Sequence, residues 1–96
     1  MTIFLTKKAE RNYRDIKSFI SYKWGDRVAE EFEKKLEDFL DILEDFPELG
    51  NLAVAEKGIF GFQLTKQTRI FYRIKKNRII VLALFDVRQD PNKSPK

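Results

Sequence analysis

The sequence predicts an α+β fold, in which a short N-terminal strand precedes an antiparallel helical hairpin packed on a small antiparallel β-sheet. Two features of the hydrophobic pattern carry this prediction. Up to residue 46, hydrophobic residues recur every three or four positions, which is the period of an amphipathic helix. After residue 50 they alternate as in a half-buried strand, and residues 79–85 form a continuous hydrophobic run typical of a central strand.

A chain of 96 residues has room for one domain. We place this domain at residues 1–90. Residues 91–96 are polar and contain Pro91 and Pro95, so they are expected to form a flexible tail.

The first strand is expected at the hydrophobic residues 3–5. Thr6 follows it and is placed to cap the first helix with its hydroxyl, and Gly25 ends that helix. The buried face of the helix is predicted from its hydrophobic stripe, which consists of Ala9, Tyr13, Ile16, Ile20 and Trp24.

The second helix is expected to begin at once, with Asp26 as its N-cap and Pro47 fixing its end. Since about two residues join the helices, they must pack antiparallel. The buried face of the second helix is predicted to contain Val28, Phe32, Leu36, Phe39, Leu43 and Phe46.

The last two strands are expected to form a hairpin around Lys76 and Asn77, with a positive φ at Asn77 and Ile74 opposite Ile79. The face toward the helices is then hydrophobic, with Ile70, Tyr72, Ile74, Ile79, Val81 and Ala83. The other face mixes cations with hydrophobic residues: Arg69, Phe71, Arg73, Lys75, Arg78, Ile80, Leu82 and Leu84.

The preceding strand, around residues 59–64, has a less certain register, because a slip of one residue exchanges its faces. We expect its hydrophobic residues to face the core; they are Phe60, Phe62 and Leu64.

Charge is divided along the chain. Residues 26–48 carry three cations against ten carboxylates, whereas the residues beyond 50 carry ten cations against three carboxylates. A basic half of this kind favours an anionic partner. That partner could be a nucleic acid, an acidic protein segment, or the acidic stretch of this same chain folded back on it.

The composition excludes several kinds of chemistry. The chain has no Cys and no His, so disulfides, thiolate nucleophiles, the usual zinc sites and imidazole acid–base catalysis are excluded. No metal and no cofactor is expected. No hydrophobic run reaches the length of a membrane span and no signal peptide is evident, so we expect a cytoplasmic protein without a membrane partner.

The order of the elements and four local signatures resemble the RelE/ParE toxin superfamily of bacterial type II toxin–antitoxin modules. The signatures are residues 6–9, 46–50, 69–74 and 85–91, the last of which ends in Arg88 and Pro91. The resemblance covers nearly the whole chain. It implies a compact toxin that a cognate antitoxin neutralises, and a role in plasmid stabilization.

The superfamily is divided between two activities. The resemblance to the ParE branch implies inhibition of DNA gyrase without nuclease activity, and the resemblance to the RelE branch implies cleavage of messenger RNA on the ribosome. RNA cleavage needs a proton acceptor, a proton donor and cations. The sequence supplies cations, but it lacks His, and Tyr72 is expected to face the helices. The residues therefore favour the ParE type, with the RelE-like endonuclease as the alternative and a non-toxic partner-binding relative as the second alternative.

No catalytic residue is assigned. We expect Arg88 to form an exposed ion pair with Asp86 or Asp90, so that its removal affects function before stability. The candidates for binding the target or the antitoxin lie on the mixed face of the sheet or just after it: Lys66, Arg69, Phe71, Arg73, Lys75, Ile80, Leu82 and Arg88.

Overall fold

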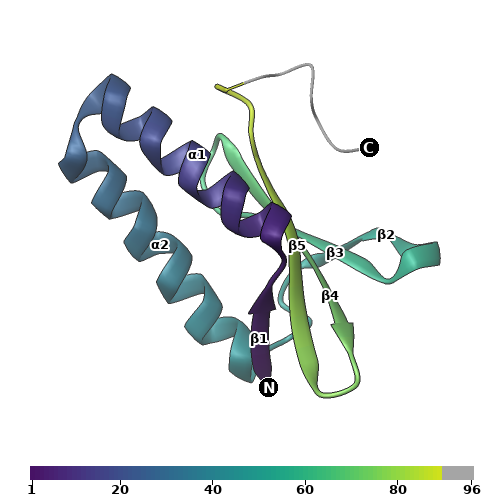
Figure 1. Cartoon of the computed structure of the whole chain (residues 1–96). Helices are drawn as coiled ribbons and strands as arrows, with labels where there is room; N and C mark the ends of the chain where they lie inside the picture. The colour runs from purple at the N-terminus through teal and green to yellow at the C-terminus, as the bar shows by residue number, and fades with distance from the viewer. Residues whose placement is uncertain (90–96) are drawn as a thin grey trace.

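A computed structural model describes residues 1–89 of the chain (Figure 1). The tail predicted at residues 91–96 lies outside the described residues. The elements are, in order, β1 (Thr2–Leu5), α1 (Lys7–Trp24), α2 (Asp26–Asp45), β2 (Asn51–Val54), the 3₁₀ helix η1 (Ala55–Lys57), β3 (Ile59–Gln63), β4 (Thr68–Lys75) and β5 (Arg78–Asp86).

The five strands form one sheet in the order β1-β5-β4-β3-β2, and the hairpin of α1 and α2 packs on one of its faces (Figure 1). The pairs formed by β2, β3, β4 and β5 are antiparallel, as predicted. The first strand differs, because β1 pairs with β5 in parallel. The sheet is therefore mixed rather than purely antiparallel.

The start of α1 is as predicted, since the Thr6 hydroxyl accepts a hydrogen bond from the Ala9 amide at 3.0 Å. The predicted role of Asp26 is wrong. One residue, Gly25 with a φ of 95°, joins the helices, so Asp26 is already the first residue of α2 and cannot be its N-cap. Its carboxylate instead accepts a hydrogen bond from the Ser21 hydroxyl. Neither helix is long and hydrophobic enough to cross a membrane, as far as residues 1–89 are concerned.

The core lies between the helical hairpin and the sheet. Three residues at the ends of the predicted helical stripes do not belong to it: Trp24 is 50% exposed, Val28 38% and Phe46 63%. They lie at or next to the ends of the two helices. The buried hydrophobic residues are Ala9, Ile16, Ile20, Ala29, Phe32, Leu36, Phe39, Leu43, Ile70, Tyr72, Ile79, Val81 and Leu84.

Aromatic contacts confirm that β3 turns its hydrophobic residues to the core. Phe62 stacks on Phe39 of α2 with the ring centroids 4.3 Å apart, and Phe60 stacks on Tyr72 of β4 at 5.3 Å. The slipped register of this strand is therefore excluded.

The hairpin of β4 and β5 has the predicted pairing of Ile74 with Ile79, but the positive φ lies at Lys76 (57°) and not at Asn77. Farther from the turn the register shifts. Tyr72 pairs with Val81 and Phe71 with Ala83, so Leu82 is an extra residue in β5.

This β-bulge reverses the facing of the residues that follow it. Leu84, predicted on the mixed face, is 4% exposed in the core, and Ala83, predicted in the core, lies beside Phe71 on the other face. The alternation counted along β5 is correct only up to the bulge.

Candidate functional site

The face of the sheet that turns away from the helices, here called the open face, combines cations with hydrophobic side chains. Residues paired on neighbouring strands lie on the same face, so their order across the sheet can be followed. Phe4, Ile80, Arg73 and Ile59 form one row across β1, β5, β4 and β3.

Part of the open face is hollowed into a depression of about 980 Å³, here called the open-face groove. Hydrophobic residues of β4 and β5 make much of its surface, and Lys8, Lys66 and Arg69 bring positive charge to it. The groove is lined by Thr6, Lys8, Ala53, Val54, Ile59, Gln63, Lys66, Gln67, Arg69, Phe71, Leu82, Ala83, Phe85 and Val87.

Arg69 is held in a defined position in this groove. Its guanidinium lies over the Phe71 ring, 5.4 Å from the centroid, and crosses the backbone at Gly61, where a Cβ atom would lie 2.5 Å from Nη2. The buried Nε has no hydrogen-bond partner, and Arg69 forms no ion pair within residues 1–89. A positioned guanidinium of this kind suits a carboxylate or phosphate ligand.

The structure divides the predicted site residues into three groups. Lys66, Arg69, Phe71 and Leu82 line the groove together. Three others share the open face but lie outside the lining of the groove: Arg73, Lys75 and Ile80. The last residue, Arg88, lies elsewhere.

Arg88 is bound on the helical side of the sheet. Its guanidinium pairs with the Asp86 carboxylate at 2.7 Å and lies over the Trp24 ring of α1, 5.1 Å from the centroid. Asp86 is 2% exposed and also accepts a hydrogen bond from the Thr68 hydroxyl at 2.6 Å. The expected ion pair of Arg88 with Asp86 is therefore confirmed, but its expected exposure is wrong, because the fold buries Asp86.

The electrostatics of Asp86 follow from these contacts. Burial alone would raise the pKa of its carboxyl, but the hydrogen bonds from Arg88 and Thr68, with the charge of Arg88, hold that pKa below its ordinary value. Asp86 is thus a buried carboxylate engaged by its own neighbours.

Tyr72 faces the helices, as predicted, and is fully buried. Its hydroxyl donates a hydrogen bond to the Pro47 carbonyl at 2.9 Å and accepts one from the Gly50 amide at 2.8 Å. Burial raises its pKa, the charge of Glu48 raises it further, and the Gly50 hydrogen bond acts in the opposite direction. Tyr72 therefore anchors the chain after α2 and does not reach the open face.

Sequence reasoning missed several residues of the open face and its groove, among them Phe4, Phe85 and Lys8. Phe4 could have been found, because it alternates with the inward residues Ile3 and Leu5. Phe85 could not, because the bulge at Leu82 sets its facing. Lys8 reaches the groove from the first turn of α1, and this placement depends on how the helix docks on the sheet.

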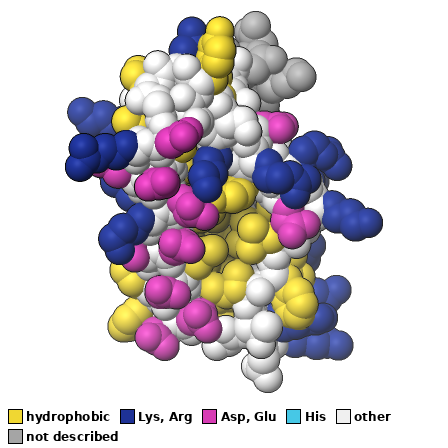
Figure 2. All heavy atoms as spheres, turned by 60° about the vertical axis from the view of Figure 1, so that its left-hand side comes forward, with side chains coloured by type: hydrophobic (Ala, Val, Ile, Leu, Met, Phe, Trp, Pro, Cys, Tyr) yellow, Lys and Arg dark blue, Asp and Glu magenta, His cyan; other side chains and the backbone are white. Residues whose placement is uncertain are grey.

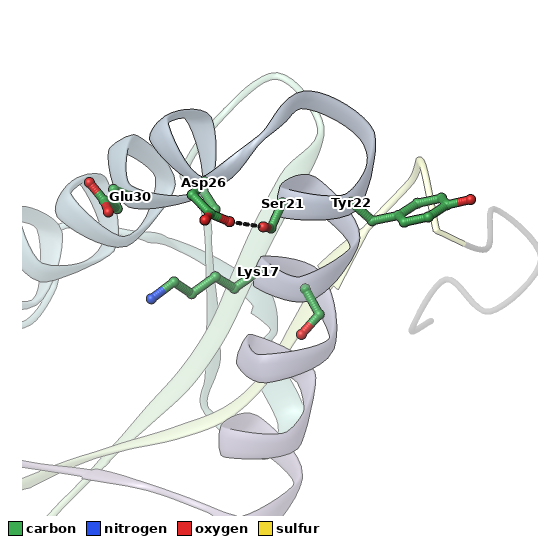
Figure 3. A pocket seen from close by; sticks show the side chains of 7 residues that line it. Lys17, Ser21, Tyr22, Asp26 and Glu30 are labelled. Atoms are coloured by element: carbon green, nitrogen blue, oxygen red, sulfur yellow. Dashed lines mark hydrogen bonds between the residues drawn. The ribbon is translucent and has the colours of Figure 1, made fainter.

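A second depression, of about 500 Å³, lies between the helices near the tip of their hairpin (Figure 3). Three of its polar side chains already have partners: Ser21 donates to Asp26, and Lys17 pairs with Glu33 at 2.9 Å. Tyr22 points away from them (Figure 3) and is 85% exposed.

The acidic residues 26–48 do not form ion pairs with the basic residues of the sheet. Figure 2 shows carboxylates in a column on the helical side of the molecule, and the exposed carboxylates of α2 project away from the sheet. Within residues 1–89, the ion pairs are Lys17 with Glu33, Lys34 with Asp38, and Arg88 with Asp86. None of these pairs joins α2 to a cation of the sheet, so the hypothesis that the acidic stretch folds back on it is wrong.

Comparison with known families gives one match over most of the chain. The family described as "ParE toxin of type II toxin-antitoxin system, parDE" matches residues 3–91. No curated protein matches the chain.

Several solved structures share the fold, among them the following three. A chain of a chromosomal ParDE TA system from P. aeruginosa is 18% identical, with a TM-score of 0.61 over 90% of this chain and 95% of that chain. A YoeB/ParE toxin from Agrobacterium tumefaciens is 17% identical, with a TM-score of 0.66 over 90% and 98%. A YoeB dimer from Staphylococcus aureus is 14% identical, with a TM-score of 0.64 over 88% and 94%.

Proposed function

Because the chain belongs to the ParE toxin family of type II toxin–antitoxin systems, we propose that it is a toxin that inhibits DNA gyrase in the cytoplasm and that a cognate antitoxin neutralises it. The alternative is cleavage of ribosome-bound messenger RNA, the activity of RelE-like relatives. The two activities make different demands on the open face.

The choice of gyrase inhibition over RNA cleavage rests on one observation: the cations of the groove are separated from the side chains that could transfer protons. The charged side chains that line the open-face groove are Lys8, Lys66 and Arg69. Tyr72 and Asp86 are buried behind the sheet and hydrogen-bonded there. RNA cleavage needs a general base within reach of the attacking hydroxyl. The arrangement in residues 1–89 instead suits binding of an anionic partner, which supports inhibition by binding.

The groove also supports a mode of antitoxin binding. Its hydrophobic surface, with Phe71, Leu82 and Phe85, suits the apolar side chains of an extended or helical segment. Arg69 and Lys66 at the same groove suit Asp or Glu side chains of that segment. We therefore place the antitoxin's neutralising segment in the open-face groove.

The target is tested by expressing the chain without its antitoxin and by adding the purified protein to gyrase and to translating ribosomes. We expect growth arrest with DNA-damage signalling, loss of gyrase supercoiling, and uncut transcripts. Cleavage of transcripts in the ribosomal A site that Arg73→Ala abolishes would overturn the proposal and establish the endonuclease.

A further inference from the structure

The structure points to a second binding surface on the open face, beside the groove. We propose that this surface binds a single nucleic-acid strand through the phosphodiester backbone and one stacked base. It is called the hairpin strip here and consists of Phe4, Arg73, Lys75, Lys76 and Arg78. The inference goes beyond gyrase inhibition, because it concerns a nucleic-acid strand that the purified chain binds directly, without gyrase.

The first argument is unneutralised charge. Residues 57–85 contain seven cations and no carboxylate. The four cations of the hairpin strip are all exposed, and none forms an ion pair within residues 1–89. The carboxylates of α2 lie on the helical side of the molecule (Figure 2). This surface therefore presents a positive field that the described part of the chain leaves open to an external anion.

The second argument is an unfavourable pairing. Lys75 lies directly opposite Arg78 in the ladder of β4 and β5. Like charges directly opposite each other destabilise a sheet. The turn between them adds Lys76, whose φ of 57° is also unfavourable for a residue with a side chain. An anion bound across the hairpin would offset the repulsion among these three cations.

The third argument is an exposed aromatic ring among the cations. Phe4 is 46% exposed, and the Arg78 guanidinium lies 5.3 Å from its ring centroid. Phe4 pairs with Ile80, which pairs with Arg73, so the ring and Arg73 lie in one row across the sheet. The pair of Lys75 and Arg78 forms the next row on the same face. Single-stranded nucleic acids bind surfaces of this kind, because bases stack on aromatic rings while cations follow the backbone.

The geometry favours a nucleic acid over an acidic peptide at this strip. A peptide needs pockets for its side chains, and the depression of the open face lies at the groove, whose lining does not include the strip residues. Two cations on one strand, Arg73 and Lys75, stand about 7 Å apart along β4 because each residue adds about 3.4 Å. A regular row of exposed cations suits a repeating phosphate backbone.

The test measures the fluorescence anisotropy of labelled single strands of about 15 nucleotides, one of DNA and one of RNA, with the full chain. We expect at least one of the two strands to bind at 50 mM salt. The strand that binds more tightly shows whether the ligand of the strip is DNA or RNA. Four phosphate contacts predict that log K falls with log salt with a slope of about −3, or about 50-fold between 50 and 200 mM.

Two variants separate the contributions of charge and stacking. Arg78→Gln should make the salt slope shallower by about 0.7, whereas Phe4→Ala should weaken binding about fivefold or more with little change in slope. The matched controls are Arg27→Gln and Phe46→Ala, whose side chains are also exposed but lie in and just after α2. Neither control should change the affinity.

Three results would overturn the inference: no binding of either strand at 50 mM salt, binding that both strip variants leave unchanged, or a glutamate-rich peptide that binds the strip more tightly than both strands. The last result would assign the strip to an acidic protein. The melting temperature of each variant verifies its folding, and Lys75→Gln replaces Arg78→Gln if that variant fails to fold.

Discussion

At the scale of single residues, Asp86 shows how a carboxylate close to a basic surface is withdrawn from it. The side chain turns to the helical side, where Thr68, Arg88 and the Arg88 amide all donate hydrogen bonds to it. Arg88 in turn covers the Trp24 ring. The pair therefore joins the ends of β5 and α1 and the beginning of β4, which gives Arg88 a structural role that its sequence position did not reveal.

Arg88→Ala is expected to lower the free energy of unfolding by about 2–3 kcal/mol at pH 7. The change leaves a buried carboxylate without its charged partner, and the loss is smaller than for a fully buried pair because Arg88 keeps a quarter of its side chain exposed. Urea unfolding measures the difference, with the exposed Arg27→Ala as control. A loss below about 0.5 kcal/mol, the usual range for surface changes, would show that the ion pair contributes little.

The same pair makes this difference depend on pH. The folded-state pKa of Asp86 lies below its ordinary value, so the stabilisation is fully present above pH about 4 and is lost as the pH falls through the folded-state pKa. The difference between wild type and Arg88→Ala should therefore shrink on acidification. A constant difference from pH 7 to pH 2 would contradict this linkage.

At the scale of elements, the sequence predicts the helices and hairpins well where a cap or a period marks them. Thr6 and Gly25 bound α1 as expected, because each acts through local backbone geometry. The bulge at Leu82 was not predictable, because residues 79–85 are all hydrophobic and no alternation reveals an extra residue. The groove depends on that bulge, so its lining could be predicted only in part.

The turn between β4 and β5 provides a test at this scale. Lys76→Gly should stabilise the protein by about 0.5–1 kcal/mol, because glycine adopts the φ of 57° without steric cost. Lys76→Gln keeps the strained backbone while it removes the charge, so it separates the two effects. Denaturant midpoints report the stabilities. Equal gains for the two variants would show that charge repulsion, not backbone strain, limits the turn.

At the scale of the whole molecule, the α+β class and the helical hairpin could be predicted from the sequence, because they rest on hydrophobic periods. The toxin family was indicated by a resemblance in the order of the elements and in four local signatures, and the family match confirms it. The separation of charge along the chain was also visible. Its arrangement in space was not, since only the packing of α2 on the face opposite Arg69 and Arg73 shows that α2 leaves the basic surface uncovered.

Placement of the antitoxin in the groove gives a prediction at the same scale. Arg69→Glu should weaken the complex with the cognate antitoxin at least about tenfold, because a carboxylate then faces the acidic side chains of the partner. Gly61→Ala should weaken it less, since the added Cβ displaces the Arg69 guanidinium without changing its charge. Titration calorimetry measures both affinities against Arg27→Glu on α2. Wild-type affinity for Arg69→Glu would place the antitoxin elsewhere.

The parallel pairing of β1 with β5 also determines when the open face forms during folding. Thr2 pairs with Arg78 and Leu5 with Val81, so two strands far apart in the sequence must pair, with β1 at one edge of the sheet. Contacts between residues so distant in sequence form late in folding, because the loop between them must close first. On the ribosome, the helical hairpin is synthesised long before β5. We therefore expect the open face, with both of its proposed binding surfaces, to assemble only near the end of translation.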